Sequence, residues 1–309
     1  MIYAPDYYPA FRCIAGDCRH SCCVGWEIDI DDDTRAAYAA VDGAIGAKLA
    51  RAIDDSGEVP HFRLTPDERC PFLRRDGLCE LILTLGEGSL CQICADHPRF
   101  RSFWSGRTEV GLGLCCEAAG ALILSQPAPM RLIPLADDGD NAPLDDEERG
   151  LLALRDDLLA IAGDTALPFD ARMTALLARA GAQMPDRPMA AWRETYRALE
   201  RLDPAWDDAL AALGDHPPHA GWDAPFARLT EYFLYRHLPA ALDDGRAAER
   251  TAFAVLSVHV IRALFAAGAP TMPRLVELAR MYSSEIEYDE DNVEALLEAL
   301  DAAKGAPHG

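Results

Sequence analysis

Ten cysteines all lie between Cys13 and Cys116, and none occurs in the longer remainder of this 309-residue chain. Thiols at this density must cross-link, bind metal or pack as small apolar groups, so they limit the possible folds more than any other feature. The opening "MIYAPDYYPAF" has no basic end followed by an apolar run, and so does not read as a secretory signal. We therefore expect a cytoplasmic protein, in a compartment that keeps thiols reduced.

Metal binding explains the clustering of the cysteines better than the two alternatives do. Cysteines that serve only as small buried hydrophobes would be scattered over both halves of the chain. Disulfides are disfavoured because no secretory signal is seen. The sequence thus predicts that sulfur–metal bonds hold the front part of the chain together.

The thiols come in groups with short spacings, which a loop can fold around one ion. Adjacent cysteines point in different directions in an extended chain, so each adjacent pair is predicted to give one ligand to any one centre. All-sulfur ligation suits zinc or an iron–sulfur cluster, and the spacings leave that choice open. The groups are Cys13-x4-Cys18-x3-Cys22-Cys23, Cys70-x8-Cys79, Cys91-x2-Cys94 and Cys115-Cys116.

Two histidines lie close to the cysteine groups. His20 sits inside the first group and His97 follows Cys94, so either could replace a sulfur. We interpret both as neighbours of the site, because a histidine beside a metal centre often acts only in its surroundings.

A change in composition near residue 125 predicts two domains. The segment from Ser125 to Asp146 has four prolines and a run of acids, as a linker does. The prediction is a cysteine-rich domain that binds a metal or an iron–sulfur cluster over 1–125, a linker over 126–146 and a helical domain over 147–309. The expected fold class is α+β, mostly α: a small metal-binding module with short hairpins, followed by an all-α domain.

Short mixed elements are expected in the front part. Alternation in "WEIDID", 26–31, predicts a half-buried strand, after which Asp33 or Thr34 would cap a short helix. Asp76-Gly77 and Ser105-Gly106 each lie between apolar runs, which predicts two hairpins. In the second hairpin, alternate residues over 110–114 would share one face, and helix resumes after Cys116.

Apolar residues at helical spacing predict that the back part is helical, with these stripes in its core. The stretch from Ala252 to Ala269 is the most apolar, but Arg262 and His259 inside it favour a buried helix over a membrane span. The stripes are Leu151, Leu152, Leu158 and Leu159; Phe169, Met173, Leu176 and Leu177; Trp192, Tyr196, Leu199 and Leu202; and Val293, Leu296, Leu297 and Leu300.

The formal net charge is −22. An acidic surface repels phosphate backbones, so nucleic acid and anionic membrane surfaces are not expected as partners. Membrane insertion is not expected either, because the most apolar stretch reads as a buried helix. Such a charge can serve solubility alone, or it can attract basic partners.

Several segments together resemble the flagellin lysine-N-methylases, bacterial enzymes related to a broader group of cysteine-rich proteins thought to chelate zinc or iron. The resemblance covers most of 1–125 and much of 225–300. The segments are "YYPAFRCIAGDCRHSCCVGWEIDID", "CPFLRRDGLCELILTLGEGSLCQICADHPRF", "GLGLCCEAAGALIL", "EYFLYRHLPAAL", "FAVLSVHVIRAL" and "ARMYSSEIEYDEDNVEALLEAL".

Eight cysteines fall on the family pattern, and the resemblance implies that they are the metal ligands. Cys91 and Cys116 are extra, and His97 stands where the family usually has tyrosine. The implied ligands are Cys13, Cys18, Cys22, Cys23, Cys70, Cys79, Cys94 and Cys115.

The activity that the resemblance implies is methyl transfer from S-adenosylmethionine to lysine side chains of flagellin, in a protein that holds an iron–sulfur centre. The expected centre is a 4Fe-4S cluster, with zinc as the alternative. No glycine-rich nucleotide-binding turn follows a clear strand, so the residues that bind the methyl donor cannot be identified from the sequence.

Candidate catalytic residues lie in "YSSEIEYDED", 282–291. A lysine amine must lose its proton before it attacks a methyl group, and aromatic faces or carboxylates can hold the cationic donor. We assign catalytic roles to Tyr282 and Glu285, with Glu287 and Tyr288 beside them. The alternative for this segment is a solvated helix start with its usual acids.

Two other functions compete with the methylase. A non-enzymatic zinc- or iron-chelating protein would explain the cysteines but would leave the helical part without a task. A redox or metal sensor would use the helical part to transmit a change at the thiols.

Overall fold

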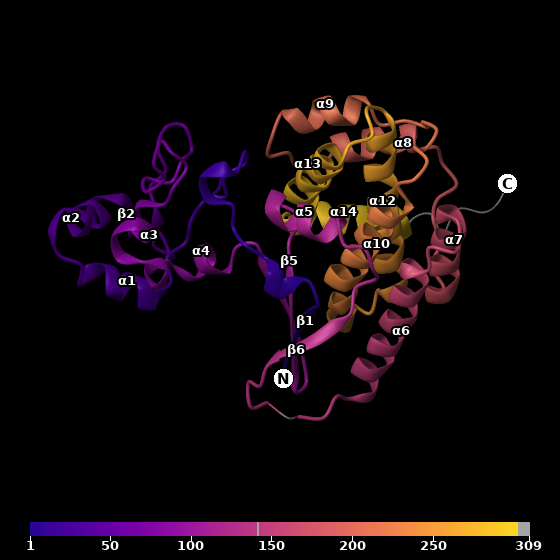
Figure 1. The fold of residues 1–309 in the computed structure, drawn as a ribbon, viewed down its shortest axis with the longest axis horizontal. Helices are drawn as coiled ribbons and strands as arrows, with labels where there is room; N and C mark the ends of the chain where they lie inside the picture. The colour runs from indigo at the N-terminus through magenta and orange to yellow at the C-terminus, as the bar shows by residue number, and fades with distance from the viewer. Residues whose placement is uncertain (141, 302–309) are drawn as a thin grey trace. The chain divides into compact units, whose positions relative to one another are not determined.

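The computed structural model describes residues 1–140 and 142–301. The described chain is mostly helical, as predicted, with short strands near its front (Figure 1). It divides into two compact units: a smaller unit, Arg12–Arg99, and a larger unit made of Met1–Phe11 and the chain from Phe100 onward.

The smaller unit is built from short helices around a small core of its own, which includes Ile28, Ile30, Phe62 and Phe72. Beside the helices it has one two-stranded antiparallel ladder. Its elements are the 3-10 turns Ala15–Asp17 and Glu87–Ser89, α1 (Asp32–Ala39), α2 (Gly43–Ala52), β2 (Ile53–Asp54), β3 (His61–Phe62), α3 (Glu80–Leu85) and α4 (Gln92–Asp96).

The strand expected over 26–31 is not formed as a strand. Ile28 and Ile30 are buried as the alternation predicts, but the segment makes only an isolated bridge from Asp29 to His61. The neighbouring strand β3 is only two residues long and pairs with β2 on its other side. It is therefore too short for residues 26–31 to form a continuous ladder with it.

Helix α1 is capped by Asp31 rather than by Asp33 or Thr34. One carboxylate oxygen of Asp31 accepts the Thr34 amide at 3.0 Å, and the other accepts the Gln92 amide at 2.7 Å. The cap therefore also ties the start of α1 to the start of α4.

The larger unit carries a four-stranded sheet in the order β4-β5-β1-β6. Strand β1 runs parallel to β5, with Ile2 opposite Thr108, and antiparallel to β6, with Ala4 opposite Ile133. The strands are β1 (Ile2–Pro5), β4 (Arg99–Trp104), β5 (Arg107–Leu112) and β6 (Leu132–Ala136).

The predicted hairpin at Ser105-Gly106 is confirmed as the β4–β5 connection. Gly106 has φ +62°, the left-handed conformation that a turn glycine adopts easily. Val110, Leu112 and Leu114 are buried, as their shared face requires.

Helices make up most of the larger unit. In Figure 1, α10 and α12 lie side by side, and α10 also packs on α5 and α6. The helices are α5 (Glu117–Leu124), α6 (Asp146–Gly163), α7 (Phe169–Ala180), α8 (Met189–Arg197), α9 (Ala205–Ala211), α10 (Asp223–His237), α11 (Ala241–Asp244), α12 (Ala247–Ala266), α13 (Met272–Tyr282) and α14 (Glu290–Asp301); 3-10 turns span Tyr8–Ala10 and Leu238–Ala240, and a π-helix spans Ser283–Glu287.

The predicted apolar stripes form much of this core. Most of their members are buried or packed against buried residues, including Trp192 and Leu296. Leu202 is the exception, at 62% exposed, because α8 ends at Arg197 and the chain leaves the helical register there. Among the described helices, none combines the length and the apolar character that crossing a membrane needs.

The observed division differs from the predicted boundary at residue 125. Residues 100–124 contribute strands and helix α5 to the larger unit, where Leu112 and Ile123 lie in its core. The expected linker over 126–146 also contains β6, which pairs with β1.

Candidate functional site

Five cysteines gather around the core of the smaller unit, and we call them the thiol cluster: Cys23, Cys70, Cys79, Cys91 and Cys94. The Cys70 amide donates to the Cys23 carbonyl at 2.8 Å, which joins two distant segments. The predicted turn at Asp76-Gly77 is confirmed and closes a bridge between Leu73 and Cys79. Cys91 and Cys94 arrive from the start of α4.

The thiols shift one another's pKa values through hydrogen bonds and electrostatic repulsion. A hydrogen bond with Cys22 lowers the pKa of Cys23 to about 7. Burial raises the pKa of Cys70 to about 12, and negative charge on Cys23 and Cys79 adds to the effect. Burial likewise raises the pKa of Cys79, with a further contribution from Cys91.

Within the thiol cluster, Cys91 and Cys94 are joined by a hydrogen bond. The hydrogen bond between their thiols lowers the pKa of Cys91 and raises that of Cys94. Cys91 is not among the ligands that the family pattern implies. The structure nevertheless places it in one cluster with four cysteines that are. The two-residue spacing to Cys94 was the sequence signal that could have identified it.

The donor chemistry of the thiol cluster fits a soft metal or an iron–sulfur cluster. Its geometry in this structure does not close around one ion: within residues 1–140 and 142–301, no three cysteine, histidine or acidic side chains are arranged to hold a metal. The thiols instead hydrogen-bond in pairs, Cys22 with Cys23 and Cys91 with Cys94.

The remaining predicted ligands lie outside the thiol cluster. Cys13, Cys18 and Cys22 belong to the front loop of the smaller unit, where Cys13 and Cys22 are exposed. The Cys13 sulfur accepts the Ala15 amide at 3.4 Å, so the loop folds locally. Cys115 belongs to the larger unit.

His97 is partly buried in the smaller unit, where it packs beside Trp26. Its ring lies 6.0 Å from that of Trp26, and burial lowers its pKa to about 4. His20 is exposed on the front loop.

A second set of functional groups surrounds the end of the π-helix in the larger unit. We call it the Glu287 cluster: Cys115, Tyr232, Arg236, His237, Glu287 and Tyr288. Each member lies in a segment that carries the family resemblance, namely "GLGLCCEAAGALIL", "EYFLYRHLPAAL" or "ARMYSSEIEYDEDNVEALLEAL".

Glu287 is the buried centre of this cluster. Its carboxylate accepts the Tyr232 hydroxyl at 3.0 Å and the His237 Nε2 at 2.6 Å, and its Oε1 lies 3.3 Å from the Arg236 Nε. Burial would raise the pKa of Glu287, but the Arg236 charge and the His237 hydrogen bond outweigh it and lower the pKa to about 2. The carboxylate is therefore ionised at neutral pH.

Cys115 and Tyr288 form the outer part of the cluster. The Tyr288 hydroxyl is hydrogen-bonded to the Cys115 thiol, whose pKa burial raises to about 12. Arg236 lies between two rings, 5.0 Å from the centroid of Phe100 and 4.8 Å from that of Tyr288. Tyr288 is 49% exposed, so it gives the cluster a face to solvent.

The π-helix explains how neighbouring acids reach different partners. Its wide turn at Ser283–Glu287 sends Glu285 toward the start of α9 and Glu287 toward α10. Single π turns inside helices are frequent at functional sites.

The two predicted catalytic residues are buried and engaged by the protein. The Tyr282 hydroxyl is hydrogen-bonded to the Tyr196 hydroxyl at 3.0 Å and donates to the Ser257 hydroxyl at 2.8 Å. Glu285 accepts the amides of Leu202 and Asp203, each at 2.9 Å.

This burial bears on both interpretations of the segment, as a catalytic site and as a solvated helix start. Tyr282 and Glu285 are 0% and 2% exposed, so a solvated helix start is wrong for them. Both side chains are enclosed by the protein, whereas Tyr288 in the same segment is 49% exposed.

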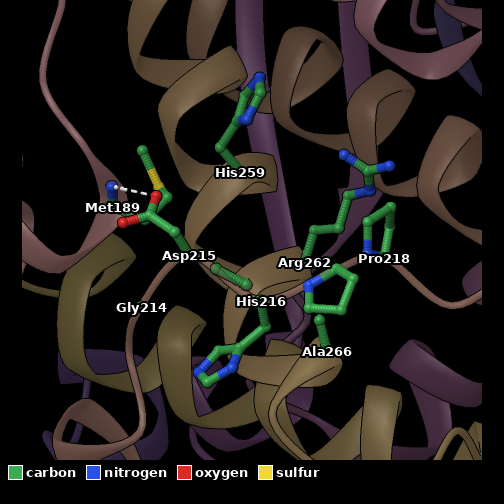
Figure 2. Close-up of a pocket in the computed structure, with 10 residues that line it drawn as sticks. Met189, Gly214, Asp215, His216, Pro218, His259, Arg262 and Ala266 are labelled. Carbon is green, nitrogen blue, oxygen red and sulfur yellow. Dashed lines mark hydrogen bonds between the residues drawn. The ribbon is translucent and has the colours of Figure 1, made fainter.

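One pocket of the larger unit lies apart from these groups (Figure 2). It has a volume of about 440 Å³, and the Met189 amide donates to Asp215 in its wall at 3.0 Å. None of the predicted site residues lines it. Its lining is Met189, Gly214, Asp215, His216, Pro217, Pro218, His259, Arg262, Ala263 and Ala266.

Part of the chain is similar to curated proteins of Salmonella. Over 136 residues, 41% of this chain, it is 30% identical to a lysine-N-methylase of Salmonella choleraesuis, and the match covers 33% of that protein. Over 134 residues it is 28% identical to the flagellar biosynthetic protein FliU of Salmonella muenchen, of which 79% is covered. The matched stretch thus spans a third of the length of that lysine-N-methylase. Neither a protein-family model nor a solved structure matches the chain.

Proposed function

We propose that this chain, a relative of the lysine-N-methylases, transfers methyl groups from S-adenosylmethionine to lysine side chains of flagellin. The observation that carries the proposal is the similarity to proteins named lysine-N-methylase and to a flagellar biosynthetic protein. The Glu287 cluster supports it, because three segments of the family resemblance meet there around an ionised carboxylate and an exposed aromatic ring.

The chemistry sets two demands on the chain. A lysine amine, with an ordinary pKa of about 10.4, must give up its proton before its nitrogen can attack carbon. S-adenosylmethionine, when bound, supplies an electrophilic methyl group on a cationic sulfur. The site must therefore hold the cationic methyl donor beside a lysine amine that is desolvated and deprotonated.

Tyr288 is the side chain of this segment best placed to meet a substrate. Its ring is half-exposed, and aromatic faces attract cations. The buried contacts of the ring with Arg236 and Cys115 fix its orientation. Glu287 acts as a positioning residue, because its charge holds Arg236 under the ring.

Tyr282 and Glu285 then serve the site by holding the π-helix in place. Their hydrogen bonds anchor it to α8, α12 and the segment before α9. This role replaces the direct contact with substrate that the sequence suggested.

The cysteine-rich unit is proposed to hold a 4Fe-4S cluster, with zinc as the alternative. Seven of the eight expected ligands lie in this unit and remain the proposed ones: Cys13, Cys18, Cys22, Cys23, Cys70, Cys79 and Cys94, of which four lie in the thiol cluster. Cys115 lies in the larger unit, in the Glu287 cluster, and is not proposed as a ligand of this centre. The group would supply folding free energy to a unit whose core is small.

The acidic character of the chain fits a basic substrate. With a net charge of −22, it attracts lysine-rich segments over several ångströms, and the attraction weakens as salt rises.

The first expected result is transfer of label from S-adenosylmethionine with a radioactive methyl group to flagellin. The purified full chain should label lysines, which mass spectrometry of the flagellin peptides can locate. Flagellin with acetylated lysines is the control, and it should take up no label. A chain that binds metal but transfers no label would instead be a chelating protein.

Variants of the π-helix segment test where the site lies. Tyr288→Ala should lower kcat/KM about tenfold, the effect of losing a cation–π contact of about 1.4 kcal/mol. Tyr282→Phe and Glu285→Gln should have smaller effects that follow their loss of stability. If all three variants methylate flagellin like the wild type, this segment is not part of the site.

A second expected result concerns the metal. Anaerobic purification should give a protein that contains iron and sulfide and absorbs visible light, and Cys79→Ser should lower the content of both. Cys116→Ser, outside the proposed ligand set, should leave the content unchanged. Stoichiometric zinc without iron would select the alternative, and a metal-free protein that is stable and active would exclude both.

A further inference from the structure

The Cys91-x2-Cys94 motif is a thiol pair of which the proposed function uses only one member. Cys94 belongs to the proposed ligand set, whereas Cys91 does not. Cys91 is 1% exposed and precedes the first residue of α4, and Cys94 lies in that helix and is partly exposed.

Two hydrogen bonds join the pair: the thiols are hydrogen-bonded to each other, and the Cys94 amide donates to the Cys91 sulfur. The turn itself is fixed from outside, because the Asp31 carboxylate accepts the Gln92 amide at 2.7 Å. The Ala95 amide closes the first helical bond on the Cys91 carbonyl at 3.0 Å.

We propose that Cys91 and Cys94 are a site of reversible oxidation, at which a small peroxide converts the two thiols into one disulfide. Cysteines in this spacing at the start of a helix can form a disulfide after a small rotation of their side chains. The local hydrogen bonds hold the partners together before any reaction, so little chain entropy is lost when the bond forms.

The reaction balances without any further co-reactant. The Cys91 sulfur, as thiolate, attacks one peroxide oxygen and the O–O bond breaks, which leaves a sulfenic acid on Cys91 and a hydroxide. The Cys94 sulfur then attacks the Cys91 sulfur, and the S–O bond breaks as the disulfide forms. Two thiols and one hydrogen peroxide thus become one disulfide and two waters.

This inference goes beyond the proposed function, and it predicts a competition at one sulfur. A Cys94 sulfur in a disulfide has no thiolate to give to a metal. Oxidation of the pair and metal binding are therefore mutually exclusive.

The test reads the disulfide directly from a single peptide. The full chain, reduced and freed of metal by a chelator, is treated with a small excess of hydrogen peroxide, alkylated and digested with trypsin. The peptide from Asp76 to Arg99 contains Cys79, Cys91 and Cys94 and no internal lysine or arginine. We expect it to lose two alkyl groups, keep the one on Cys79, and regain both after treatment with a dithiol reductant.

Variants and metal loading supply the controls. Cys91→Ser should abolish the loss of alkyl groups from this peptide, while Cys116→Ser should leave it as in the wild type. Full alkylation of the peptide after peroxide, a bond that includes Cys79, or oxidation that a dithiol cannot reverse would each overturn the proposal. So would an equal rate of oxidation in metal-loaded and metal-free protein. All these readings are independent of methyl transfer, so failure here leaves the proposed activity untouched.

Discussion

Replacing Glu287 by glutamine is expected to lower the free energy of unfolding at neutral pH by about 3 kcal/mol. The carboxylate has a pKa of about 2 in the folded chain against an ordinary value of 4.5, and each unit of difference corresponds to about 1.36 kcal/mol. The variant leaves Arg236 buried beside a neutral amide. Chemical denaturation of both proteins at pH 7 measures the difference.

The same substitution has a defined pH signature. Because folding lowers the pKa of Glu287, its stabilisation is complete above about pH 4.5 and is lost as the pH falls toward about 2. The stability gap between wild type and variant should therefore be constant from pH 7 to 5 and close below that. Glu290→Gln, which removes an exposed acid three residues further on, should change stability by less than about 0.5 kcal/mol. A gap that widens on acidification would contradict the assignment.

A second large effect is expected at the buried ion pair between Glu109 and Arg155. Both side chains are 1% exposed, and the Arg155 guanidinium donates to the Glu109 carboxylate at 2.8 Å. Glu109→Ala would leave the arginine charge unpaired between the rings of Trp104 and Tyr235. The expected cost is about 3–5 kcal/mol of unfolding free energy, measured by denaturant titration.

A double variant separates the charge from the packing. Glu109→Leu with Arg155→Met removes both charges and fills similar volume, so it should be more stable than Glu109→Ala. Glu147→Ala, an exposed acid near the start of α6, is the matched control and should be nearly silent. If the double variant is as unstable as the single one, packing rather than the buried charge decides the cost.

Local signals in the sequence predicted the elements that depend on local chemistry. Gly77 and Gly106 both adopt positive φ in the turns that their neighbours suggested. The periodicity around Trp192 and Leu296 placed both residues in the core. These features are legible because turn geometry and helical burial are set within a few residues.

Features that depend on distant pairing could not be read in this way. Strand β6 lies in a stretch rich in proline and acids, and its partner β1 is some 130 positions earlier in the chain. The observed unit boundary lies at Arg99 and not at the expected residue 125, because β5, which pairs with β1, and α5 belong to the larger unit.

The candidate site shows the same limit at the level of side chains. Glu287 and Tyr288 stand beside the predicted catalytic pair in the sequence. Of these four residues only Tyr288 is exposed, and the sequence alone does not show that difference. Two partners of Glu287 come from α10: Tyr232 lies 55 residues upstream and His237 lies 50 residues upstream. The two-residue spacing of Cys91 and Cys94 indicates their pairing, although Cys91 is not part of the family pattern.

The smaller unit interrupts the larger one between Phe11 and Phe100, after its first strand has been made. On the ribosome, β1 emerges first and must wait for its neighbours β5 and β6 until the whole intervening segment has been synthesised. Domains generally fold as units during synthesis, earliest parts first. The inserted segment, with the thiol cluster inside it, can therefore fold while the helical host is still incomplete, and the sheet of the larger unit can form only after that segment has been synthesised.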